Sequence, residues 1–102
     1  MKQEYKLTDE FGTHLADGAK AVAFRMVRLE PYINLKTEIV LDFTGVRHSN
    51  SSFVNSLLTD LVEEHGEALL TRLSFRGCNP LLHVLVEGAI ALGLQKHAQH
   101  AK

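Results

Sequence analysis

The segment of residues 39–64 constrains the fold most, because a buried-strand pattern there leads through a short loop into an apolar helical stretch. The run Ile39-Val40-Leu41 is continuously apolar, as expected of a central strand that protein covers on at least one face. A helix is predicted from Ser51 to about Glu64, and its buried stripe consists of Phe53, Leu57, Leu58, Leu61 and Val62. A strand followed closely by a helix is the repeating unit of α/β folds.

Two further elements are predicted before this segment. Weak alternation over residues 2–8 predicts a short edge strand, and apolar residues at helical spacing predict a helix over residues 19–30. Asp17 is a candidate N-cap, because its carboxylate can accept hydrogen bonds from the free amides of the first turn. Pro31 is expected to end or bend this helix, since proline has no amide hydrogen. The central strand then covers residues 37–43.

Two more elements are predicted after it. Gly66 is expected to end the central helix, and residues 68–75 are predicted to form a third strand. Asn79 is the candidate N-cap of the last helix, which begins at Pro80 and extends to about residue 94. Strands and helices therefore alternate along the chain. The prediction is an α/β fold with a small mixed or parallel sheet, joined by right-handed crossovers and covered by helices.

Length and composition indicate an ordinary soluble domain. The 102 residues are expected to form a single domain, residues 1–102, with residues 95–102 as a flexible polar tail. The 11 basic and 12 acidic residues give a formal net charge of −1 without long runs, so neither nucleic acid nor an anionic membrane is indicated. Cys78 is the single cysteine, which excludes an internal disulfide. With no signal-peptide pattern and no apolar run of about 20 residues, a cytoplasmic protein is predicted.

No cofactor and no metal are expected. His97 and His100 have helical spacing, but they lie in the predicted tail, and no third ligand follows at a suitable distance in the sequence. Gly45 and Gly77 are isolated turn glycines rather than parts of a glycine-rich phosphate loop. Functional residues must therefore be sought where the strands end.

Two serines at the start of the central helix are the main functional candidates. Ser51 and Ser52 follow the end of a strand, which is where ligands and partners dock on an open α/β sheet. In one interpretation a serine only caps the helix, as Ser and Asn commonly do. In the other, one hydroxyl accepts a phosphate, because a helix N-terminus favours the negative charge of a phosphoserine.

The sequence around these serines resembles that of the STAS domains. A strand, a short loop and then Asn50-Ser51-Ser52 at the start of a helix are similar to the bacterial anti-sigma factor antagonists, whose loop carries an aspartate-serine pair. Matched by position, Asn50 stands at that aspartate, and Ser51 stands at the serine that an ATP-dependent anti-sigma kinase phosphorylates. Ser52 matches a frequent second serine, and Phe53 stands where the antagonists usually have glycine.

A closer resemblance is to a prokaryotic STAS-like family of undefined function. Its pattern is similar to LDF at 41–43, GV at 45–46, NSSF at 50–53 and FRGC at 75–78. The resemblance implies a STAS-like fold and a non-enzymatic signalling module. Members commonly accompany histidine-kinase-like ATPases. This resemblance therefore implies docking to such an ATPase or to an anti-sigma factor. The resemblance to the antagonists adds a possible switch, which is phosphorylation of the serine.

The expected docking surface lies at the carboxyl ends of the strands. In a parallel sheet, the junctions at residues 45–52 and 76–80 emerge on the same edge. Arginine at these junctions suits either a phosphate or a carboxylate of the partner. The predicted partner-binding residues are Arg47, His48, Asn50, Ser51, Phe53 and Arg76.

Three alternatives stay open from the sequence. Ser51 and His48 would suit a small hydrolase or transferase, for which Asp42 is the available orienting acid. Cys78 is either a thiol that a helix N-terminus activates or a small residue packed beneath its loop. The apolar last helix would also suit a homodimer.

Overall fold

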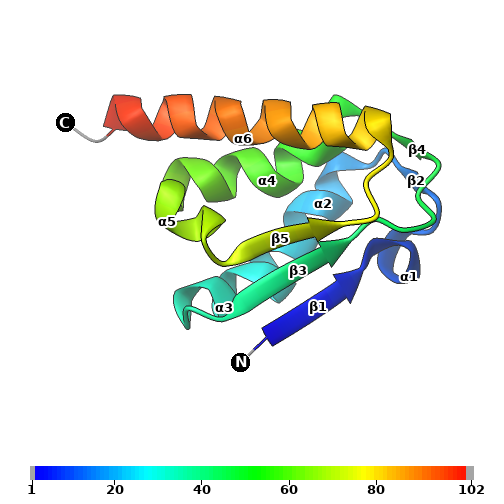
Figure 1. Ribbon diagram of the computed structural model, residues 1–102, viewed down its shortest axis with the longest axis horizontal. Helices are drawn as coiled ribbons and strands as arrows, with labels where there is room; N and C mark the ends of the chain where they lie inside the picture. The colour runs from blue at the N-terminus through cyan, green and yellow to red at the C-terminus, as the bar shows by residue number, and fades with distance from the viewer. Residues whose placement is uncertain (1, 101–102) are drawn as a thin grey trace.

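The computed structural model describes residues 2–100, and these form a two-layer α/β fold (Figure 1). In chain order the elements are β1 (Lys2–Lys6), α1 (Leu7–Phe11), β2 (His14–Leu15), α2 (Gly18–Phe24), the π-helical segment η1 (Arg25–Leu29), α3 (Glu30–Asn34), β3 (Glu38–Asp42), β4 (His48–Ser49), α4 (Ser51–His65), α5 (Glu67–Leu70), β5 (Leu73–Arg76) and α6 (Pro80–His100). The main sheet has three parallel strands in the order β1-β3-β5. The second sheet is the parallel pair β2-β4, beyond the carboxyl ends of the main strands. The parallel α/β arrangement agrees with the prediction.

Strand β3 is the centre of the main sheet because its apolar run is buried. Ile39, Val40 and Leu41 are all buried, and Ile39 pairs with β1 on one side and β5 on the other. Side chains alternate along a strand, so Ile39 and Leu41 face the helices while Val40 faces the other side of the sheet. The central strand predicted over residues 37–43 is confirmed, one residue shorter at each end.

Helices α4 and α6 pack closely because small residues lie between them. A Cβ atom on Gly93 would lie 2.6 Å from Val62 Cβ and 2.8 Å from the Thr59 carbonyl oxygen, so only glycine fits at this crossing. The buried hydroxyl of Thr59 donates a hydrogen bond to the Ala89 carbonyl oxygen at 3.1 Å. The predicted apolar stripe of α4 is buried along its whole length.

The helical path before β3 continues past Pro31 to Asn34, so of the two predicted outcomes, an end or a bend, the end is wrong. Helix α2 begins after Asp17, which caps it as predicted through hydrogen bonds from the amides of Ala19 and Lys20. The chain then changes from α-helical to π-helical hydrogen bonding in η1, where the Glu30 amide donates to the Arg25 carbonyl oxygen. Pro31 then lies in the first turn of α3, a position at which helices tolerate proline.

The strand predicted over residues 68–75 is shorter than expected, because its first half is helical. Gly66 ends α4 as predicted, at φ +68°, and α5 follows directly. The Thr71 hydroxyl then donates to the Ala68 carbonyl oxygen at 2.8 Å and closes the turn. Short apolar runs do not distinguish a strand from a buried helical turn, which explains the error.

Helix α6 begins at Pro80, with Asn79 accepting a hydrogen bond from the Leu82 amide at 2.8 Å, and extends beyond the expected end near residue 94. The reason is a distant contact: His97 Nδ1 donates to the Glu63 carbonyl oxygen at 2.8 Å. The expected tail is thus helical through residue 100, while residues 101–102 lie outside the described residues. Among residues 2–100, no helix combines the length and apolarity that a membrane crossing requires.

Candidate functional site

The two predicted junctions meet at the carboxyl edge of the main sheet. Gly77 has φ +70°, and a Cβ atom there would overlap the Thr44 side chain. The Asn79 side-chain amide donates to the Val46 carbonyl oxygen at 3.4 Å. The loops after β3 and β5 therefore lie against each other, as the parallel topology predicted.

Asn50 holds the start of α4 in place through both ends of its side-chain amide. Its Oδ1 accepts a hydrogen bond from the Phe53 amide at 2.8 Å, so Asn50 rather than a serine is the N-cap. Its Nδ2 donates to the Ala16 carbonyl oxygen at 3.3 Å, and its backbone amide donates to the Leu15 carbonyl oxygen at 3.2 Å. A carboxylate would keep the cap but would donate nothing to Ala16. The geometry accounts for asparagine at this position.

The bridge between β2 and β4 brings two histidines together. His14 pairs with His48 in the parallel register, and the centroids of their imidazole rings are 4.8 Å apart. The Thr13 hydroxyl lies 3.0 Å from His14 Nδ1, within hydrogen-bond distance. A cavity of about 170 Å³ opens here, lined by both histidines, Ser49 and Asn50, with Leu15 and Ala16 as its apolar part.

Ser51 and Ser52 are both exposed in the first turn of α4, but their surroundings differ. A Cβ atom on Gly18 would lie 3.2 Å from the Ser52 hydroxyl and 3.1 Å from the Ser56 hydroxyl, so Ser52 lies against the start of α2. Within residues 2–100, neither serine hydroxyl makes a hydrogen bond, and Ser51 is not among the atoms close to Gly18. Ser51 is therefore the more accessible of the two phosphorylation candidates.

The other predicted partner-binding residues are not all at this surface. Arg47 and His48 are exposed beside Asn50. Phe53 is 1% exposed and packs edge-on against Phe11, with ring centroids 5.0 Å apart, so it supports the surface from beneath. Arg76 is exposed on the face of the sheet that the helices leave open, where it forms an ion pair with Glu4.

The residues of the alternative hydrolase are not joined by hydrogen bonds. Within the described chain, no hydrogen bond links Ser51 to His48 or His48 to Asp42. Asp42 instead accepts a hydrogen bond from the Thr44 amide at 2.9 Å. Hydrogen bonds from the side chain and the backbone of Thr44 hold the pKa of Asp42 below its usual range, and Arg76 and Lys6 lower it further. The carboxylate of Asp42 therefore orders its own loop.

Of the two alternatives for Cys78, a packed small residue and an activated thiol, the structure favours the packed residue. It is half-buried and packs against the hydrophobic core. Burial raises the pKa of its thiol, which disfavours the thiolate needed for nucleophilic reactivity. In residues 2–100, moreover, no three His, Cys, Asp or Glu side chains gather as metal ligands, and the side chain of His100 lies outside the described residues.

The sequence prediction missed the residues that the N-terminal part of the chain contributes to this surface. His14 and Ala16 line the cavity with Asn50, and Asp17 and Gly18 begin the helix that packs on Ser52. A strand of two residues has no periodicity to detect. The one available signal is the polar run Gly12-Thr13-His14, which is typical of a turn.

Comparison with known proteins identifies a family. The model of a family described as "STAS-like domain of unknown function (DUF4325)" matches residues 21–82, which is more than half of the chain. The match includes β3, β4, α4 and β5, and therefore the Asn50-Ser51-Ser52 segment. No curated protein and no solved structure matches the chain.

Proposed function

The chain belongs to the STAS-like family, and on that premise we propose that it docks a protein partner through the start of α4. At the level of the family, it is a regulatory, non-catalytic module. The docking surface consists of Arg47, His48, Asn50 and Ser51 together with His14. These residues surround one cavity or directly flank it, which supports a single contact area.

The partner proposed here is a histidine-kinase-like ATPase or an anti-sigma-type factor. The family resemblance stated above motivates this choice, and the chemistry of the surface is compatible with it. Arg47 is a free cation for a partner carboxylate, since it makes no ion pair within residues 2–100. The cavity beside the two histidines would accommodate a small apolar side chain of the partner.

Phosphorylation of Ser51 is the proposed switch. The observation that carries this proposal is the exposure of Ser51 in the first turn of a 15-residue helix whose N-cap is already provided by Asn50. The serine hydroxyl is thus not needed for the fold. A phosphate there would add about −1.5 to −2 charges at a helix end that stabilises negative charge. Docking of the partner would change without unfolding of the domain.

The proposed switch can be tested by phosphorylating the protein in vitro. Incubation with the cognate ATPase and ATP should place one phosphate on Ser51, which mass spectrometry of the digested protein would detect. Ser51→Ala should abolish the modification and leave docking of the partner intact, whereas Ser51→Glu should weaken docking about tenfold or more, which is the effect of roughly 1.4 kcal/mol.

A matched control is available on the sheet. Ser74 is also exposed, but it lies in the middle of β5 and not at a helix end. Ser74→Ala should change neither phosphorylation nor docking. Phosphate on Ser52 in place of Ser51, or equal docking by the wild type and Ser51→Glu, would contradict the proposed switch.

A further inference from the structure

The main sheet leaves one face open, which is unusual for parallel strands. Sheets made only of parallel strands are normally covered on both faces. Here the helices lie on one face, and no described element covers the other (Figure 1). Residues from all three strands line that open face: Lys2, Glu4, Lys6, Glu38, Val40, Asp42, Ser74 and Arg76. Val40 is 5% exposed although it faces this side, so longer side chains cover it.

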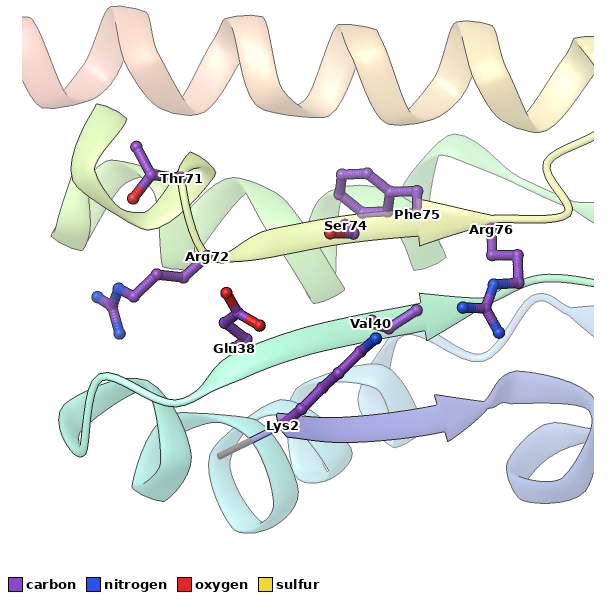
Figure 2. Close-up of a pocket in the computed structure, with 8 residues that line it drawn as sticks. All are labelled: Lys2, Glu38, Val40, Thr71, Arg72, Ser74, Phe75 and Arg76. Carbon is purple, nitrogen blue, oxygen red and sulfur yellow. The ribbon is translucent and has the colours of Figure 1, made fainter.

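A cavity of about 280 Å³ lies on this open face, above Val40 (Figure 2). It is larger than the cavity of about 170 Å³ beside His14 and His48. Figure 2 shows the Lys2 side chain lying across β3, with Ser74 above it on β5 and Arg76 toward the carboxyl end of that strand. Arg72 lies at the opposite end of β5. The cavity approaches the size of small-molecule pockets, which begin at about 300 Å³.

The charges around this cavity are mainly positive. Lys2, Arg72 and Arg76 line it, and Glu38 is the single carboxylate among its lining residues. Lys2 forms no ion pair within the described residues. Arg72 Nη1 donates to the Ile33 carbonyl oxygen at 3.0 Å, which fixes the guanidinium but does not neutralise it. The ion-pair partner of Arg76 is Glu4, which lies outside the cavity lining.

A second copy of this chain is a poor occupant of the open face. Both edge strands carry cations here, and the central strand carries carboxylates, with Lys2 beside Glu38 and Lys6 beside Asp42. If two such faces stacked around a twofold axis along the strands, each central carboxylate would meet its own copy. With the axis across the strands, Lys2 would meet Lys6 and Glu38 would meet Asp42. Like charges oppose each other in both arrangements, which disfavours association.

We propose that this cavity binds a small organic oxyanion, whose phosphate or carboxylate oxygens accept hydrogen bonds from Lys2, Ser74 and Arg76. Charge complementarity selects an anion, because three cations line the cavity against one carboxylate. The hydroxyl of Ser74 makes no other hydrogen bond within the described residues. Val40 offers an apolar floor for the carbon skeleton of the ligand. This site lies on the sheet, apart from the docking surface at α4.

The experiment is a titration of the ¹⁵N-labelled protein followed by NMR, at constant ionic strength maintained with chloride. Inorganic phosphate and succinate are the two probes, and chloride alone is the reference. Saturable shifts of backbone amides in β1, β3 and β5 are expected with one probe or both, and the stronger probe identifies the acidic group of the ligand. Shifts no larger than those in chloride for both probes would overturn the proposal.

Charge variants test the assignment in both directions. Lys2→Gln and Arg76→Gln should each weaken binding about tenfold, because each removes a charge-assisted hydrogen bond. Glu38→Gln should strengthen binding several-fold, a gain that a misfolded variant would not produce. Lys20→Gln removes an exposed charge elsewhere and should leave the dissociation constant unchanged. Equal weakening by Lys20→Gln, or no gain from Glu38→Gln, would contradict the site. Ser51→Ala should bind the anion as the wild type does. Failure of the anion-site proposal is therefore distinguishable from failure of the docking proposal.

Discussion

Asn50 shows how a single side chain connects two helices at the proposed docking surface. Its oxygen caps α4, and its NH₂ group donates to the Ala16 carbonyl oxygen just before α2. The resemblance to anti-sigma factor antagonists aligns this position with an aspartate, which could serve only the first of these contacts. Asparagine therefore has a structural role here in addition to any role in partner recognition.

We predict that Asn50→Asp lowers the free energy of unfolding by about 1 kcal/mol, because it removes one hydrogen-bond donor and retains the cap. Asn50→Ala should lower it by about 2 kcal/mol, since it removes both contacts. Denaturant unfolding followed by circular dichroism measures both changes. Gln95→Glu, the same amide-to-carboxylate change at an exposed site, should stay within about 0.5 kcal/mol of wild type. If Asn50→Asp unfolds like wild type, the contact with Ala16 contributes nothing.

Asp42 should make the stability of the domain depend on pH. Its pKa is lowered in the folded protein, first by hydrogen bonds from Thr44 and further by Arg76 and Lys6. The folded state thus favours the carboxylate, so the stabilisation is present above the unfolded-state pKa and is lost as pH falls through the folded-state pKa. We predict that Asp42→Asn flattens the acid-side decrease in unfolding free energy measured from pH 6 downward. An unchanged slope would show that other carboxyl groups cause the decrease.

At the scale of elements, two glycines of α6 have opposite environments. Gly93 lies against Val62 and Thr59 of α4, whereas a Cβ atom on Gly88 would have nothing within 4 Å. Gly93→Ala should lower the unfolding free energy by about 1–3 kcal/mol through overpacking. Gly88→Ala should raise it by up to about 1 kcal/mol, because alanine is the better helix former. Thermal unfolding of the two variants measures the sign of each change in unfolding free energy. A stabilised Gly93→Ala variant would contradict the close approach of α4 and α6.

Elements with strong local patterns could be predicted from the sequence, and the others could not. The apolar run of β3 and the capped, amphipathic α4 were located to within a residue or two. The pair β2-β4 is held by contacts between residues far apart in the chain, such as the Arg47 amide with the Thr13 carbonyl oxygen at 2.9 Å. The extension of α6 depends on His97 and Glu63 in the same way. Such contacts leave no periodicity in the sequence.

At the scale of the whole molecule, the alternation of strands and helices was enough to predict a sheet with parallel strands. The open face of that sheet could not be predicted from it. The weak alternation over residues 2–8 predicted an edge strand, but it did not indicate whether another element would cover either face of that strand. Most of the proposed docking surface was likewise predictable, namely Arg47, His48, Asn50 and Ser51, which follow β3. His14 could not be predicted in the same way, because β2 has only two residues.

The strand order has a consequence for how this chain folds. Lys2 pairs with Glu38, Ile39 with Leu73, and His14 with His48, so strand partners lie about 35 positions apart and no hairpin exists among the described residues. Each pairing must close a long loop before it gains any hydrogen bonds, and the intervening helix shortens that loop once it has formed. We therefore predict that helices α2 and α4 form early, and that the sheet with its one open face is completed late in folding.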